Sequence, residues 1–157
     1  MTLPANSRLL NIQRSFNKWL HTKLVTEPSS PRCFINYGDV EGSVPKGTNL
    51  WLNIFWLTFM GSIFTNIRVQ LNIMSKIQND QYGNNVAALS DYVVEALNSN
   101  TIPLYDFADT QNIIDLTPYC LIPRFKESDT LSFPPLSPNR GIRVDYMLYM
   151  SRDGILP

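Results

Sequence analysis

Few side chains in this 157-residue sequence have the type and spacing that catalysis requires. His21 is the only histidine, so a Ser-His-Asp triad or a histidine-rich metal site would have to form around a residue that we place on a helix surface. Cys33 and Cys120 are far apart in the sequence, and neither belongs to a C-x-x-C pair. Each lies among apolar residues, which is typical of a small buried hydrophobic side chain. The cysteines therefore indicate neither a metal centre nor a disulfide framework.

Three aspartates and one glycine-containing stretch are the remaining candidates for binding chemistry. Asp106 and Asp109 lie three residues apart, Asp115 follows, and together they could hold a cation. Acidic residues in loops more commonly accept hydrogen bonds from nearby backbone amides, and we predict that role here. The stretch from Gly38 to Gly42 lacks the Lys-Ser/Thr of a phosphate-binding loop. We therefore expect no enzymatic activity, no cofactor and no metal site.

Composition argues against nucleic acid or a membrane as the main partner. Thirteen basic residues balance thirteen acidic ones, and general binding to nucleic acid requires a basic excess. The most apolar run, from Leu50 to Met60, is too short to cross a bilayer, and the N-terminal segment has no compact apolar core of a signal peptide. We expect a soluble protein from a reducing compartment, with residues 1–157 in a single domain.

Two helices are predicted from apolar residues that recur at steps of three and four. The first covers residues 7–24, with Asn6 or Ser7 as its cap, and the second runs from Asn84 or Asn85 to about Leu97. We expect both to pack on the sheet and to bury one apolar stripe each. The core-facing residues of the two stripes are Leu9, Ile12, Phe16, Trp19, Leu20, Leu24, Val86, Leu89, Val93 and Leu97.

A long β-hairpin is predicted at about 49–77. Its first arm, Asn49 to Met60, is apolar on both alternating faces, and Gly61-Ser62 makes the turn. The second arm, Ile63 to Lys76, alternates apolar and polar residues. Both arms exceed the usual strand length of about 5 to 6 residues, so we expect them to overhang a small domain.

The remaining segments complete an α+β fold with an antiparallel sheet, the long hairpin and two packed helices. A short strand is predicted at Arg32 to Tyr37 and a loop at 101–111. The segment from Ile113 to Lys126 is extended but contains two prolines, which confines it to an edge or an irregular path. A Pro-rich loop at about 131–139 precedes a last alternating strand that reaches Met150.

The order helix, strand, long hairpin, helix, strands resembles the tail terminator proteins of tailed bacteriophages. The Tyr82-Gly83 turn also leads into a helix of small and aliphatic residues, from Asn85 to Leu97, like that family's helix after the hairpin. The resemblance implies a virion tail or neck protein made in the host cytoplasm. It further implies a homohexameric ring that caps the tail tube and joins it to the head-neck proteins. Another ring-forming component, of the head-completion or tube-like kind, is the alternative within this class.

Ring formation gives two groups of residues an expected role. Phe59, Met60, Ile63 and Phe64 surround the hairpin turn, where a soluble monomer would normally be polar, so we predict that they contact another subunit or the tail tube. Asn66, Gln70 and Asn72 line one face of the second arm. We predict either that they line a neutral channel through which DNA passes without binding, or that they simply face solvent.

A reading from a different class also remains open. The protein could be a monomeric module that binds a small ligand or a peptide, with Trp51, Trp56 and Tyr146 as an aromatic pocket. The mass of the particle in solution separates the two readings.

Overall fold

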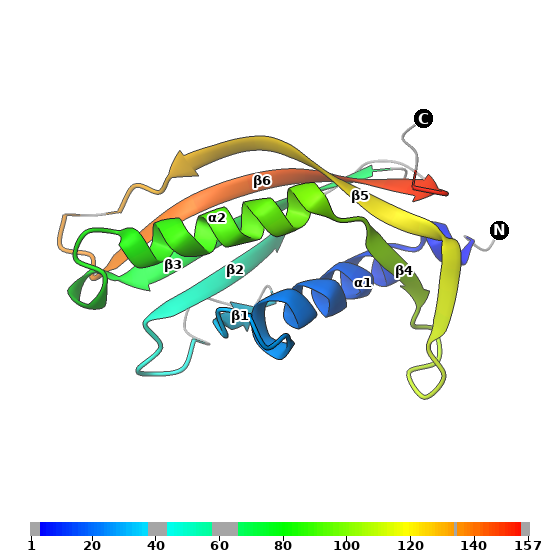
Figure 1. Cartoon of the computed structure of the whole chain (residues 1–157), viewed down its shortest axis with the longest axis horizontal. Coiled ribbons are helices and arrows are strands. Elements are labelled where there is room, and N and C mark those ends of the chain that lie inside the picture. The colour runs from blue at the N-terminus through cyan, green and yellow to red at the C-terminus, as the bar shows by residue number, and fades with distance from the viewer. Residues whose placement is uncertain (1–3, 38–43, 58–65, 134, 155–157) are drawn as a thin grey trace.

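The computed structural model describes residues 4–37, 44–57, 66–133 and 135–154, which form two α-helices and six strands (Figure 1). The predicted helices, the pairing of the two hairpin arms and the last strand are confirmed, whereas the predicted turn at Gly61-Ser62 lies outside the described residues. The predicted loop at 101–111 is wrong in part because it contains strand β4. Short helical turns lie at Ala5–Ser7, Thr22–Thr26 and Ile77–Asn79. The main elements are α1 Leu9–His21, β1 Phe34–Asn36, β2 Leu50–Trp56, β3 Asn66–Lys76, α2 Asn84–Ser99, β4 Ile102–Asp106, β5 Ile114–Thr130 and β6 Asn139–Arg152.

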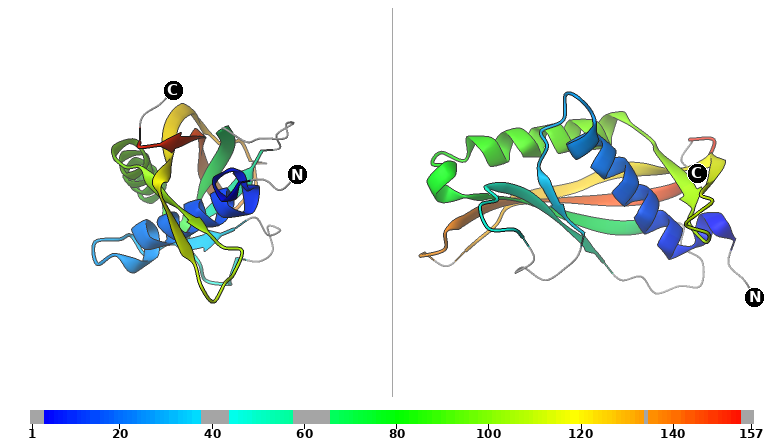
Figure 2. Two further views of the ribbon diagram at one scale, coloured as in Figure 1. Left: turned by 90° about the vertical axis from the view of Figure 1, so that its right-hand side faces the viewer. Right: turned by 90° about the horizontal axis from the view of Figure 1, so that it is seen from below.

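The six strands form one curled sheet in the order β1-β2-β3-β6-β5-β4 (Figure 2). The prediction of a purely antiparallel sheet is wrong, because β1 pairs with β2 in parallel while the other neighbours are antiparallel. A tight turn can only produce an antiparallel pair, whereas the chain between β1 and β2 is long enough to return to the starting end. The sheet is therefore mixed.

The hairpin of β2 and β3 has antiparallel register from Leu50↔Ser75 to Trp56↔Val69. Its expected overhang is wrong for the described part of β3, because every residue from Asn66 to Lys76 also pairs with β6. Strands β5 and β6 are themselves 17 and 14 residues long, so they exceed the 11 residues of β3. The predicted contact residues Phe59, Met60, Ile63 and Phe64 lie outside the described residues.

Strand β5 changes from a central to an edge strand along its length. Strand β4 pairs with it only as far as Leu121, so the part from Ile122 to Thr130 has β6 as its one neighbour. Pro118 lies where the β4–β5 register shifts, and Pro123 lies in the edge half. This agrees with the predicted edge or irregular path, since proline cannot donate a ladder hydrogen bond.

Both helices pack on the same face of the sheet and enclose one apolar core. The ring of Phe16 in α1 meets that of Trp56 at 5.3 Å, and the hydroxyl of Tyr146 donates to Asn98 Oδ1 in α2 at 2.9 Å. Trp56 and Tyr146 flank Val69 in one cross-strand row, so they share a face. The predicted core residues are confirmed as buried: Phe16, Trp19, Leu89 and Val93. We call the opposite side of the sheet the open face, because no described helix covers it.

Helix α1 also covers the edge strand β4 through side-chain hydrogen bonds. The backbone N–H of Tyr105 donates to Ser15 Oγ, and that of Phe107 donates to Asn11 Oδ1, both at 2.9 Å. Asn11 Nδ2 in turn donates to Asp106 Oδ1 at 3.2 Å. These bonds satisfy edge amides that would otherwise be buried without a partner.

The predicted helix caps are wrong at both helices. Arg8 occupies the N-cap position of α1 without a capping side-chain bond, because the chain first makes a short helical turn. At α2 the capping group is Asp80, which accepts hydrogen bonds from the N–H groups of Asn85 and Val86. A carboxylate is well suited to this place, since it also faces the positive end of the helix dipole.

Candidate interaction surfaces

The three aspartates considered for a cation bind the backbone instead. Asp106 accepts from the N–H of Ala108, Asp109 from that of Gln111, and Asp115 from that of Thr117. These bonds confirm the predicted role of loop acids. Within the described ranges, His, Cys, Asp and Glu form no group of three or more that could hold a metal ion.

The histidine and the two cysteines lie apart from one another and from any cluster of acids. His21 is exposed at the end of α1, with Nδ1 at 3.1 Å from Thr26 Oγ1. Cys33 is buried, and burial raises the pKa of its thiol to about 11. Cys120 is half-buried, and burial raises the pKa of its thiol as well. Both thiols are therefore protonated and weakly nucleophilic at neutral pH.

The predicted aromatic pocket of Trp51, Trp56 and Tyr146 does not exist. Trp51 pairs with Met74 on the open face, whereas Trp56 and Tyr146 lie on the helix-covered face. Adjacent strand residues point to opposite sides, so Trp51 cannot join the other two. Tyr146 is moreover fully buried in the core.

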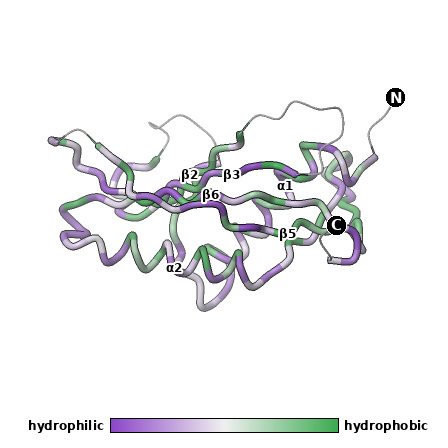
Figure 3. Tube along the Cα trace, turned by 90° about the horizontal axis from the view of Figure 1, so that it is seen from above, coloured by the Kyte–Doolittle hydropathy of each residue, from purple (hydrophilic) through white to green (hydrophobic). Residues whose placement is uncertain are grey.

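The open face holds the residues that we predicted to line a channel. Asn66, Gln70 and Asn72 are half-buried and alternate along β3 with core residues (Figure 3). Gln70 Nε2 donates to Asn72 Oδ1 at 3.1 Å, and Arg68 lies on the same side of the strand. The structure thus brings these residues together, and whether they line a channel stays a prediction.

A network of four charged residues crosses this face over three adjacent strands. Arg68 Nη2 on β3 lies 2.7 Å from Asp145 Oδ2 on β6 and 3.2 Å from Glu127 Oε1 on β5. Arg143 Nη2 lies 3.3 Å from the same Glu127 oxygen, and Arg143 Nε lies 3.8 Å from Asp145 Oδ1. The hydrogen bond to Asp145 raises the pKa of Arg68, so the guanidinium remains charged at every accessible pH. Asp145 is only 2% exposed.

Strand register explains the network and its neutrality. Gln70, Asp145 and Glu127 form one cross-strand row, with Arg68 and Arg143 in the rows on either side. Arg124 and Asp129 join the same face, opposite Met147 and Arg143 respectively. The open face of β3, β6 and β5 therefore carries three arginines, Lys76 and three carboxylates. Alternation along β6 places Arg143 and Asp145 on the same face, but only strand pairing reveals their partners.

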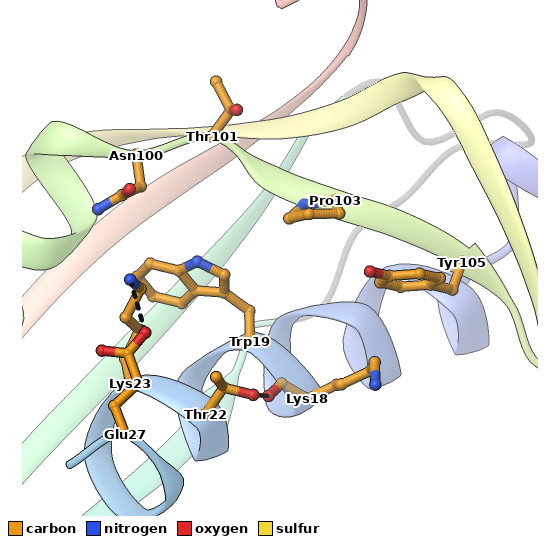
Figure 4. A pocket seen from close by; sticks show the side chains of 9 residues that line it. All are labelled: Lys18, Trp19, Thr22, Lys23, Glu27, Asn100, Thr101, Pro103 and Tyr105. Carbon is orange, nitrogen blue, oxygen red and sulfur yellow. Dashed lines mark hydrogen bonds and ion pairs between the residues drawn. The ribbon is translucent and has the colours of Figure 1, made fainter. Parts of the chain in front are cut away.

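A pocket of about 360 Å³ lies between α1, the end of α2 and the start of β4 (Figure 4). We call it the Trp19 pocket; the rings of Trp19, Pro103 and Tyr105 form apolar walls. Lys18 Nζ lies 5.4 Å from the centre of the Tyr105 ring, a cation–π distance. The other lining residues are Thr22, Lys23, Glu27, Asn100 and Thr101. Lys23 and Glu27 pair with each other at 3.1 Å, which leaves the pocket apolar inside and polar at its rim.

Comparisons with known proteins identify no family for this chain. No model of a protein family matches the sequence, and no curated protein matches it either. Among the described residues, no helix has the length and apolar character needed to cross a membrane.

Proposed function

We propose that this protein is a structural subunit of a phage tail or neck, and that its ring caps the tail tube and joins it to the head-neck proteins. The order α1, β1, hairpin β2–β3, α2 and further strands is the feature on which the resemblance to tail terminators depends. A different ring-forming neck or tail component would have the same features. In either case the protein works by assembly, as part of the virion, after synthesis in the host cytoplasm.

The ion-paired arginines of the open face are the observation that carries the proposal. Arginines on a surface that DNA passes would bind phosphates and retain the DNA. Here Arg68 and Arg143 both contact the carboxylates of Asp145 and Glu127, and Asn66, Gln70 and Asn72 continue the surface without charge. A face with this composition can line a wet channel and let DNA slide.

Electron microscopy tests the ring directly. We expect six-membered rings of the purified protein, either free or mounted on isolated tail tubes, and a mass near six subunits for the free ring. Subunits of this kind can remain monomeric until the tube is present, so the mounted state is decisive. A monomer both in solution and on the tube would refute the proposal.

Charge variants test the role of the open face. Glu127→Gln with Asp129→Asn removes two exposed carboxylates beside the arginines, so assembled particles should eject DNA more slowly. Asp91→Asn with Glu95→Gln is the matched control, because it removes two exposed carboxylates from the outer side of α2. Equal ejection rates for the two double variants would show that DNA does not pass the open face.

The hairpin tip gives a further test, although it lies outside the described residues. Phe59→Ser with Phe64→Ser should leave the isolated subunit folded but prevent ring formation or attachment to tails. Circular dichroism and electron microscopy separate these effects. Unfolding of the double variant would place the tip in the subunit's own core.

The Trp19 pocket supports a second candidate, a module that binds a small ligand or a peptide. Its aromatic walls and polar rim are typical of such sites. This function requires a protein that stays monomeric at every concentration and binds its ligand saturably. Tyr105→Ala should then abolish the binding.

A further inference from the structure

Three exposed apolar side chains gather at one end of the molecule. Leu136 is 96% exposed, Tyr82 is 82% exposed and Ile77 is 38% exposed. The backbone N–H of Ile77 donates to the Pro138 carbonyl at 2.8 Å, and Arg140 Nη1 donates to the Asp80 carbonyl at 2.8 Å. These bonds hold the turn before α2 against the chain that enters β6 (Figure 1). We call Ile77, Tyr82 and Leu136 the apolar tip.

Leu136 is the most prominent side chain of the tip. It lies in the turn Pro135-Leu136-Ser137-Pro138, and the sequence 131–138 contains no charged residue. Turns of a soluble monomer are normally polar, and a nearly fully exposed leucine between prolines has no role in its own core. Such a side chain is well placed to enter an apolar site on another molecule.

The Trp19 pocket is such a site, and it lies at the other end of α2. Tyr82 and Gly83 precede this helix, whereas Asn100 and Thr101, which line the pocket, follow it. A helix of 16 residues is about 24 Å long, so the tip and the pocket of one subunit cannot meet. Two complementary patches at opposite ends of one chain produce head-to-tail contacts between copies, which close into a ring if the rotation permits.

We propose that the apolar tip, led by Leu136, inserts into the Trp19 pocket of a second copy of this chain. The rings of Trp19, Pro103 and Tyr105 give the pocket apolar walls against which an exposed leucine side chain can bury its surface. The hydroxyl of Thr101 at the rim can donate a hydrogen bond to a backbone carbonyl of the incoming tip. The uncharged tip brings no charge into the pocket that would need a partner. The proposal rests on the proposed ring and names the contact between its subunits.

Cysteine cross-linking tests the contact between two copies. We would mix Leu136→Cys protein with Thr101→Cys protein, both in a Cys120→Ser background because Cys120 is only half-buried. A disulfide-linked dimer of the two variants is expected. The control mixture contains Leu10→Cys, whose position on α1 is 49% exposed, with Thr101→Cys. No link in the first mixture, or equal yields in both, would overturn the proposal.

Assembly variants separate this contact from the ring itself. Leu136→Ser and Thr101→Trp, which fills the pocket from its rim, should each weaken association at least tenfold, whereas Leu10→Ser should not. A urea midpoint close to that of the unmodified protein shows that each variant is folded. Rings of unchanged stability in both variants would refute the contact and leave the ring proposal intact. Cross-linking without any ring, free or on tail tubes, would retain the contact and refute the ring.

Discussion

Removing Arg68 and removing its buried partner Asp145 should destabilise the protein by different amounts. Asp145 is 2% exposed, whereas the side chain of Arg68 is 37% exposed. Arg68→Ala leaves a buried carboxylate whose nearest remaining cation, Arg143 Nε, lies 3.8 Å from Oδ1. Asp145→Ala leaves two guanidinium groups that reach solvent and still have Glu127 beside them. The loss of the arginine should therefore cost more than the loss of the carboxylate.

The expected magnitudes follow from the exposure of the group that each variant leaves behind. Loss of one partner of a fully buried ion pair costs about 3–5 kcal/mol. Arg143 Nε remains 3.8 Å from Asp145 Oδ1, so Arg68→Ala should cost less than this but more than Asp145→Ala. Loss of one charged hydrogen bond, with the remaining groups in water, costs about 1.5 kcal/mol for Asp145→Ala. The double variant Arg68→Met with Asp145→Leu removes both charges, so it should lower the free energy of unfolding by less than Arg68→Ala alone.

Urea unfolding followed by circular dichroism measures these differences, because a domain of this size is expected to unfold in one step. The slope against urea should be the same in all variants, so that the midpoints report stability alone. Arg124→Ala is the control, since Arg124 is exposed on the same face, and its effect should stay within about 0.5 kcal/mol. Equal losses for the two single variants, or a larger loss for Asp145→Ala, would refute the assignment of Asp145 as a buried charge held by Arg68.

Three further predictions concern the fold. Leu89→Ala should lower the free energy of unfolding by about 2–5 kcal/mol because Leu89 is 2% exposed in the core. Leu136→Ala is the control and should change it by less than about 0.5 kcal/mol in dilute solution. A loss below about 1 kcal/mol for Leu89→Ala would contradict the packing of α2 on the sheet. Asp80→Ala should cost about 0.5–2 kcal/mol through the lost helix cap. Burial would raise the pKa of Asp80, but hydrogen bonds from Asn85, Ser75 and Val86 outweigh burial and lower the pKa in the folded protein. The contribution of Asp80 to the free energy of unfolding is therefore present above pH 3.8 and is lost as the pH falls through the lower pKa of the folded state. An acid unfolding curve unchanged by Asp80→Ala would contradict this. The pKa of Cys33 is raised from 9.0 to about 11, so its contribution to the free energy of unfolding is complete below pH 9 and declines as the pH rises to about 11. Cys33→Ala should therefore remove the decline of stability between these pH values. Rapid labelling of the native Cys33 thiol at about pH 8 would refute its burial.

Local periodicity determined most of the regular elements of this protein. The helical stripes that contain Phe16 and Val93 are buried as expected, because a repeat of three and four residues places them on one side of any helix that the segment forms. The antiparallel pairing of β2 with β3 likewise follows from alternation within one stretch of chain. The register does not, because a two-residue turn at Gly61-Ser62 would pair Asn53 with Gln70, whereas the structure pairs it with Asn72. Such patterns need no knowledge of distant residues.

Contacts between segments far apart in the sequence decided the rest. Strand β4 contains a proline and was expected to be loop, but Ser15 and Asn11 of α1 bind the amides of its edge. The parallel pairing of β1 with β2 depends on the long connection between these two strands, and no pattern within Phe34–Asn36 encodes it. Alternation places Asp145 on the face of β6 opposite the core, yet it is buried because β3 and β5 bring Arg68 and Glu127 beside it. Alternation assigns a side chain to a face of the sheet, but only the folded chain determines which charges, edges and pockets that face will meet.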